Sequence, residues 1–217
     1  MKELKKYKYV LFDAANTLIH KPMLWEKILS VFEKYNIKIP LEKIQYNHKL
    51  ISEIIDFPDR TSKDFYSLFN KELLISLGII PSNELIDTLY TECSYLPWEK
   101  FSDTEFLKKI PVPIGVLSNF NKKLPELLES LFGNIFSDII VSESSKMRKP
   151  TPEFYDYALT TIGFESKEIL YIGDSLKLDV IPAKGAGFEA LLINRNGFFG
   201  KNNFSINNIY ELNNFFN

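Results

Sequence analysis

The residues best suited to do chemistry each follow an apolar, strand-forming run, directly or after a loop. They are Asp13, Ser118, Lys149 and Asp174, with a further acid at Asp179. In a parallel sheet the carboxyl ends of the strands meet at one edge, so we expect these side chains to converge. Carboxylates that crowd together repel one another, and an oxygen-seeking divalent cation removes that cost. The acids therefore predict a Mg²⁺ site.

The remaining polar groups indicate which kind of ligand would bind beside the metal. Thr17 and Ser118 supply hydroxyl donors, and Lys149 supplies a fixed positive charge. Free backbone N–H groups after Asp13 and Ser118 would add further donors. This mixture suits a phosphate better than a neutral ligand. Singly, such residues more often cap turns or face solvent, so the prediction depends on their occurring together and in this order.

The elements that must position these residues alternate between strand and helix. Continuously apolar strands are expected at 7–12, 114–118, 138–141, 169–172 and 189–193, with helices at 124–132, 152–161, 179–184 and near the C-terminus. This pattern predicts an α/β protein whose Rossmann-like, three-layer core holds a central parallel sheet buried on both faces. Thr151 is expected to N-cap the helix that begins at Pro152.

A long helical stretch interrupts the α/β pattern after the first strand. Apolar residues recur at helical spacing from about residue 23 to 108, broken near Pro40, Pro58 and Pro81, and Ser82 is expected as an N-cap. We therefore predict two domains. The core comprises residues 1–19 and 109–217, and residues 20–108 form an all-helical inserted domain.

Composition narrows the class of protein further. The chain has 217 residues, a formal net charge of −2 and one cysteine, Cys93. No basic excess argues for nucleic acid as a partner, and a cysteine-rich zinc site and an intrachain disulfide are excluded. The apolar run behind the charged residues 1–6 is too short for a signal peptide or a membrane span. We expect a cytoplasmic protein with no membrane partner.

Four motifs in order resemble those of the haloacid dehalogenase-like (HAD) hydrolase superfamily. They are Asp13-Ala14-Ala15-Asn16-Thr17, then Val116-Leu117-Ser118-Asn119, then Arg148-Lys149-Pro150-Thr151-Pro152, and Gly173-Asp174-Ser175 with Asp179. The match spans the whole core, and the helical insert resembles the C1-type cap of that superfamily. The resemblance implies a phosphatase that acts on a small phosphorylated metabolite.

The resemblance also assigns roles to residues. Asp13 is the implied nucleophile, which forms an aspartyl-phosphate that water hydrolyses. Mg²⁺ is held by Asp13, the Ala15 carbonyl, Asp174 and Asp179, the last directly or through water. The implied phosphoryl-binding groups are the side chains of Thr17, Ser118 and Lys149 and the backbone N–H of Asn119.

Ala15 departs from the phosphatase pattern, which has a second aspartate two residues after the nucleophile. General acid–base help of that kind contributes about 10²–10⁴-fold, so we expect slow hydrolysis of alkyl phosphates. Three interpretations stay open. The first is a slow or specialised phosphatase. The second is a dehalogenase or phosphonatase, although dehalogenases lack an equivalent of Asp174 and a phosphonatase needs a cap lysine. The third is a phosphate- or partner-binding protein that has lost catalysis.

Several other residues are weaker candidates for a role at the site. His20 is a possible replacement acid, and His48 is expected to pack in its helix rather than act. Trp25 and Phe57 are weak candidates for substrate contact. Lysines on the helical insert could serve a phosphonatase, although solvent-facing roles are favoured for them: Lys27, Lys34, Lys43 and Lys49. Asn16 replaces a more usual glycine and is expected to adopt a left-handed backbone.

Overall fold

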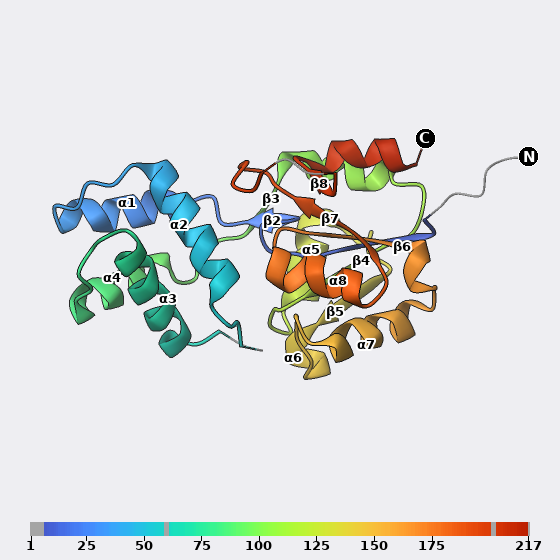
Figure 1. Ribbon diagram of the computed structural model, residues 1–217, viewed down its shortest axis with the longest axis horizontal. Coiled ribbons are helices and arrows are strands. Elements are labelled where there is room, and N and C mark those ends of the chain that lie inside the picture. Colours follow the sequence, from blue (N-terminus) through green and yellow to red (C-terminus); the bar gives the residue numbers. More distant parts are fainter. Residues whose placement is uncertain (1–6, 59–60, 201–202, 217) are drawn as a thin grey trace, which may run out of the picture. The chain divides into compact units, whose positions relative to one another are not determined.

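A computed structural model describes residues 7–58, 61–200 and 203–216 (Figure 1). The charged lead-in predicted at residues 1–6 lies outside this description. The chain divides into two compact units, a larger one formed by residues up to His20 and from Lys100 onward, and a smaller one spanning Lys21–Glu99. The chain leaves the larger unit within one residue of the predicted boundary, but it returns nine residues earlier than predicted.

The early return has a clear packing reason. The helix η1 (Ser102–Lys109), which we had assigned to the insert, packs against the C-terminal helix η4 (Ile209–Phe215) of the larger unit. Asp103 of η1 is buried, and its Oδ2 atom accepts a hydrogen bond of 2.7 Å from the backbone N–H of Ile209. These contacts bind η1 to the C-terminal segment.

The larger unit is built on a six-stranded sheet in the order β5-β4-β1-β6-β7-β8, and every pairing in it is parallel. Its strands are β1 (Tyr9–Phe12), β4 (Ile114–Ser118), β5 (Asp138–Val141), β6 (Ile169–Gly173), β7 (Glu189–Ile193) and β8 (Ser205–Ile206). The predicted α/β fold with a parallel, Rossmann-like sheet is confirmed. The two-residue strand β8 was not predicted.

Helices of the larger unit connect these strands. They are α5 (Leu124–Phe132), α6 (Ser142–Ser145), α7 (Pro152–Ile162), η2 (Ser166–Glu168), the π-helical η3 (Leu176–Val180) and α8 (Ile181–Gly185). Thr151 precedes α7 as predicted, but its hydroxyl does not cap the helix. It donates instead to the Arg148 carbonyl at 2.7 Å, so the N-cap prediction was wrong for the side chain.

The smaller unit consists of α1 (Leu24–Lys34), α2 (Leu41–Ile54), α3 (Lys63–Ser76) and α4 (Asn83–Cys93) around its own apolar core. The hydroxyl of Ser82 accepts a hydrogen bond from the Leu85 N–H at 3.2 Å, which confirms that predicted cap. The short strands β2 (Ile19–His20) and β3 (Glu99–Lys100) lie where the chain crosses between the units. Among the described residues, no helix combines the length and the apolar character needed to cross a bilayer.

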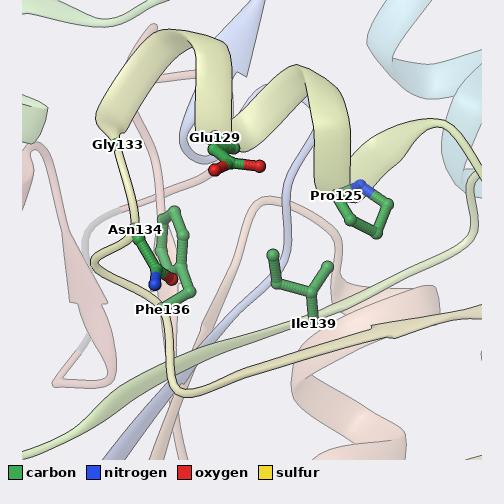
Figure 2. A pocket seen from close by; sticks show the side chains of 6 residues that line it. All are labelled: Pro125, Glu129, Gly133, Asn134, Phe136 and Ile139. Atoms are coloured by element: carbon green, nitrogen blue, oxygen red, sulfur yellow. The ribbon is translucent and has the colours of Figure 1, made fainter.

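A surface hollow of about 280 Å³ lies beside the edge strand β5 (Figure 2). Residues of α5, of β5 and of the loop between them line it: Pro125, Glu129, Gly133, Asn134, Phe136 and Ile139. None of them is a predicted site residue. The chemistry must therefore be sought at the carboxyl ends of the strands.

Candidate active site

Sheet topology brings the predicted residues to one place. β4 and β5 lie on one side of β1, whereas β6 and β7 lie on the other, so the order of connections reverses at β1. Ligands of such sheets bind beyond the carboxyl ends of the strands at this point. Asp13 extends β1 there, and its N–H donates to the Ile172 carbonyl of β6 at 2.8 Å. Ser118 ends the neighbouring β4, and Asp174 follows β6.

Three carboxylates gather at these strand ends. One oxygen each from Asp13, Asp174 and Asp179 lies within 4.8 Å of the others. Asp13 and Asp179 are buried, and Asp174 is half-buried. All the donors are hard oxygen atoms, the type that Mg²⁺ prefers, and several further positions would be filled by water. The residues present therefore fit the predicted cation.

Lys149 neutralises part of this negative charge. Its side chain is 2% exposed, and Nζ lies 2.6 Å from Oδ1 of Asp13 and 2.6 Å from Oδ1 of Asp179. The Asn119 side chain holds the lysine backbone, because Oδ1 accepts from the Lys149 N–H at 2.8 Å and Nδ2 donates to the Lys149 carbonyl at 2.9 Å. Sequence reasoning assigned Asn119 only a backbone donor, and this clamp was not foreseen.

Asp179 is held by three donors of the protein itself. Oδ1 accepts from Lys149 and from the Tyr171 hydroxyl at 2.8 Å, and Oδ2 accepts from the Ser175 N–H at 3.0 Å. Both oxygens already have protein donors, so this geometry favours Asp179 as the residue that fixes Lys149 beside Asp13. Tyr171 was missed by sequence reasoning, because a tyrosine inside a buried strand looks like ordinary core.

Burial and charge set the ionisation of the cluster. Burial raises the pKa of Asp13 to about 7, Lys149 opposes that rise, and Asp179 and Asp174 add to it. Burial alone would lower the pKa of Lys149, but the two carboxylates outweigh it and raise the pKa above its usual range. The carboxylates therefore favour the charged form of Lys149, and positive charge nearby favours the ionised form of Asp13.

Backbone hydrogen bonds close the turn that follows β1, which carries Ala15 and Thr17. The Ala14 carbonyl accepts from the N–H groups of Leu18 and Ile19, at 2.8 and 3.0 Å, and Asn16 donates to the Ile19 carbonyl at 2.6 Å. Asn16 has φ of 63°, the predicted left-handed conformation. The Ala15 carbonyl takes no part in these bonds, which leaves it in keeping with its predicted role as a metal ligand.

The two predicted hydroxyl groups differ in their partners. Ser118 Oγ donates to Oδ1 of Asp13 at 3.2 Å. Thr17 is fully buried, yet among the described residues its Oγ1 has no hydrogen-bond partner. Buried hydroxyls are nearly always hydrogen-bonded, so the Thr17 hydroxyl, which lacks a partner, is consistent with a group that binds a ligand. Within the described ranges, no hydrogen bond joins the Thr17 hydroxyl to the carboxylate cluster.

The weaker candidates have aromatic neighbours. The His20 ring stacks on Phe101, with centroids 4.1 Å apart and an interplanar angle of 10°. His48 lies 5.2 Å from the Trp25 ring and 4.8 Å from Phe69, which agrees with the packing role favoured for it. Phe57 packs on Phe65 at 4.9 Å. These contacts are ordinary packing between aromatic rings.

Comparisons with known proteins show the family to which the chain belongs. A family model described as haloacid dehalogenase-like hydrolase matches residues 7–187. The haloacid dehalogenase-like hydrolase domain-containing protein 3 of Danio rerio is 29% identical over 119 residues, which cover 52% of this chain and 49% of that protein. The glyceraldehyde 3-phosphate phosphatase of Methanopyrus kandleri is 24% identical over 87% of this chain and 84% of its own. The chain thus spans about half of the first of these relatives.

Solved structures share the fold. YfnB of Bacillus subtilis, a HAD-hydrolase structure bound to magnesium, has a TM-score of 0.69 at 21% identity over 97% of this chain and 98% of its own. An L-2-haloacid dehalogenase has a TM-score of 0.64 at 20% identity, with coverage of 97% and 98%. Identities this low show the fold alone, so the choice between these chemistries rests on the site residues.

Proposed function

Because the chain belongs to the haloacid dehalogenase-like hydrolase family, we propose that it is a Mg²⁺-dependent phosphatase for a small phosphorylated metabolite. The observation that carries the proposal is the setting of Asp13. Its Oδ1 accepts from Lys149 and Ser118, while Asp174 and Asp179 complete a carboxylate cluster around it. A carboxylate nucleophile for phosphorus needs this combination of positioning and charge neutralisation.

Each residue of the cluster has a role in the proposed reaction. An oxygen of Asp13 attacks phosphorus, the bond from phosphorus to the leaving oxygen breaks, and an aspartyl-phosphate forms. Water then attacks the phosphorus, which releases inorganic phosphate and restores the Asp13 carboxylate. Lys149, Ser118, the Thr17 hydroxyl and the Asn119 N–H bind the phosphoryl oxygens, and Asp179 fixes Lys149 through the 2.6 Å contact.

The metal would be held by Asp13, Asp174 and the Ala15 carbonyl, with Asp179 behind them. When bound, Mg²⁺ neutralises charge on the transferring phosphoryl group and on the carboxylates. Without it, burial keeps the pKa of Asp13 near 7, so the nucleophile would be only partly ionised at neutral pH. The magnesium recorded in the YfnB structure is in line with this assignment.

Ala15 shapes the substrate preference that we propose. A methyl side chain cannot protonate the leaving oxygen or deprotonate water, so the leaving group must depart with little help. Acyl and aryl phosphates meet that condition better than alkyl phosphates. The His20 ring is stacked on Phe101, which favours a packing role over that of a replacement acid. We therefore infer a slow or specialised enzyme.

The helical unit Lys21–Glu99 is inserted between β1 and β4, the position of a C1-type cap, and we assign it that role. The glyceraldehyde 3-phosphate phosphatase of Methanopyrus kandleri acts on a small phosphorylated compound by its name, and it matches most of this chain. That relative supports a metabolite of this size as the substrate. We expect the protein to act in the cytoplasm, with neither nucleic acid nor a membrane as partner.

A second candidate function is a phosphate- or partner-binding protein without turnover, and Ala15 is the observation that favours it. The retained Asp13, Lys149, Asp174 and Asp179 weigh against it, because burying charge without use is costly. A dehalogenase is disfavoured by Asp174, which that reaction does not need. A phosphonatase would need a cap lysine at the substrate.

The test is a hydrolysis screen of aryl, acyl and alkyl phosphates with and without Mg²⁺, on the wild type, Asp13→Asn and Ala15→Asp. We expect metal-dependent release of phosphate from aryl and acyl substrates, and a loss of at least about 10³-fold in Asp13→Asn. Ala15→Asp should raise the rate with alkyl phosphates by about 10²-fold and change the aryl rate less, because only poor leaving groups need an acid.

Three other results would overturn the proposal. If the wild type and Ala15→Asp are both inert with every phosphate, the protein is not a phosphatase. Beryllium fluoride bound at Asp13 without turnover would establish the binding protein instead. Halide release from a 2-haloacid without metal would establish a dehalogenase.

A further inference from the structure

A cluster of side chains outside the carboxylate site is hydrogen-bonded to the end of the turn that follows Asp13. We call it the Arg195 bracket, and it comprises Arg195, Phe101, Asp103 and His20. Nη2 of Arg195 donates to the Thr17 carbonyl at 2.7 Å, and Nη1 donates to Oδ2 of Asp103 at 2.7 Å. The fork of one guanidinium group therefore joins the Asp13 turn to η1, segments about 85 residues apart in the sequence.

Aromatic stacking fixes the plane of that fork. Cζ of Arg195 lies 3.9 Å from the centroid of the Phe101 ring, and the His20 ring stacks on the same ring at 4.1 Å. Two groups this close to one ring must occupy its opposite faces. The Phe101 N–H also donates to the Leu18 carbonyl at 3.1 Å. Lysine lacks the planar, forked donor set that this arrangement uses.

The ion pair of the bracket is largely shielded from solvent, and two of its polar atoms lack hydrogen-bond partners among the described residues. The side chains of Arg195 and Asp103 are 14% and 7% exposed. Within the described part of the chain, Arg195 Nε and Asp103 Oδ1 have no hydrogen-bond partner. An apolar pair of similar volume often replaces a buried ion pair without loss of stability. Stability alone is therefore a weak explanation for keeping an arginine here.

The orientation of Thr17 supplies a better explanation. Arg195 holds the Thr17 carbonyl, whereas the Thr17 hydroxyl is buried and unsatisfied. Threonine has a stiff side chain because of its branched Cβ, so fixing the peptide also fixes the direction of the hydroxyl. A donor aimed in advance contributes to binding the transferring phosphoryl group without reorganisation.

We propose that Arg195 is a positioning residue, which aims the Thr17 hydroxyl at the phosphoryl group by holding the Thr17 carbonyl. The inference rests on the proposed phosphatase function, but it concerns a segment that joins β7 to β8 and lies outside the four motifs. Arg195 touches neither substrate nor metal in this assignment. Its effect passes through the Asp13 turn alone.

The test compares Arg195→Met and Arg195→Lys with a structural control, Tyr9→Phe. The Tyr9 hydroxyl donates to Oδ2 of Asp138 at 2.6 Å near the amino ends of the strands, so its removal affects the same unit away from the site. With an aryl phosphate and Mg²⁺, we expect Arg195→Met to lower kcat about ten- to a hundredfold. KM should stay within about threefold, and Arg195→Lys should recover little because it cannot span both acceptors.

Chemical rescue separates positioning from damage to the fold. Guanidinium at low millimolar concentration should restore part of kcat in Arg195→Ala and should leave Tyr9→Phe unchanged. Two results would overturn the inference. One is a kcat of Arg195→Met within about twofold of the kcat of Tyr9→Phe, and the other is equal rescue of Arg195→Ala and Tyr9→Phe by guanidinium.

A readout without catalysis keeps the two proposals distinguishable. If the wild type hydrolyses no phosphate, the proposed function fails, and hydrogen exchange decides the positioning inference. The N–H groups of Leu18 and Ile19 close the turn onto the Ala14 carbonyl. They should exchange at least about tenfold faster in Arg195→Met than in Tyr9→Phe, and equal exchange would show that Arg195 does not hold the turn.

Discussion

The carboxylate cluster of the larger unit differs from His48 and Cys93 of the smaller unit in how ionisable side chains withdrawn from solvent are held. The cluster pairs opposite charges, as in the contacts of Lys149 with Asp13 and Asp179. His48 and Cys93 are half-buried, and their surroundings favour the neutral form. Burial lowers the pKa of His48 to about 4, with Lys49 adding to the shift, and burial raises the pKa of Cys93 to about 11. At both side chains desolvation is the largest influence, although Lys21 and Lys27 act against it at Cys93.

This contrast separates chemistry from packing. Burying a charge is expensive, and the cost is met only where a partner of opposite sign is held at hydrogen-bond distance. The larger unit provides such partners at the carboxyl ends of its strands, where the topology converges. In the helical unit, His48 lies against the rings of Trp25 and Phe69 and serves as a core side chain. The charged cluster is therefore where changes should cost the most.

The largest effect is expected from Lys149→Met. Removing this cation leaves Asp13 and Asp179 buried without a counter-charge, and breaking a buried pair in this way costs about 3–5 kcal/mol of unfolding free energy. Turnover should also be lost, because Lys149 is a proposed ligand of the phosphoryl group. Urea unfolding followed by far-UV circular dichroism measures the stability, and added Mg²⁺ should recover part of it by binding the carboxylates.

The matched control is Lys63→Met in the helical unit. Lys63 pairs with Asp87 at 2.9 Å, and both side chains are 57% exposed. Exposed pairs contribute little because solvent screens them, so no measurable change in stability is expected. Equal losses in the two variants would mean that the Lys149 cluster is no more important than a surface pair.

A smaller loss of stability is expected at Gly173, whose backbone lies against the Asp179 side chain. A Cβ added at Gly173 would overlap both the Cβ and the carboxyl group of Asp179, so that side chain would have to move away from Lys149. Gly173→Ala should cost about 1–3 kcal/mol by overpacking and should lower kcat as well. Gly185→Ala is the control, since nothing lies within 4 Å of its added Cβ. If both variants keep wild-type kcat, Asp179 does not fix the lysine.

Much of the fold could be predicted because its signals are local. The bounds of β4, α5, β5 and β7 agree with the sequence prediction, since apolar strands, a helix-ending Gly133 and prolines mark them plainly. What was missed depends on distant contacts. The two residues of β8 form a strand only because β7 lies beside them, and η1 joins the larger unit only through partners such as Ile209.

The candidate site divides in the same way. Asp13, Ser118, Lys149, Asp174 and Asp179 could be proposed because each stands at a recognisable place in a motif. Their supports could not. Tyr171 and Arg195 are separated in sequence from what they hold, and the Asn119 side chain was overlooked beside its own N–H. Residue types show which groups can react, whereas only the folded chain shows which groups keep them in place.

The smallest effect is expected from His48→Phe in the helical unit, and it concerns how the free energy of unfolding depends on pH. The pKa of His48 is about 4 in the folded chain and 6.5 for the free side chain, so the unfolded chain binds more protons between these values. Its contribution to stability is fully present above pH 6.5 and is lost as the pH falls through 4, a change on the order of 2 kcal/mol for this half-buried side chain. His48→Phe cannot take up a proton and should remove that slope.

Tryptophan fluorescence suits this measurement, because Trp25 and Trp98 both belong to the helical unit and the chain has two tryptophans. Urea unfolding of the wild type and of His48→Phe is compared at pH 7.5 and pH 5.0, and the difference between the two proteins isolates the histidine. We expect the wild type to lose more stability than the variant on acidification. Parallel losses would show that the pKa of His48 is the same in the folded and the unfolded chain, so that the fold does not favour its neutral form.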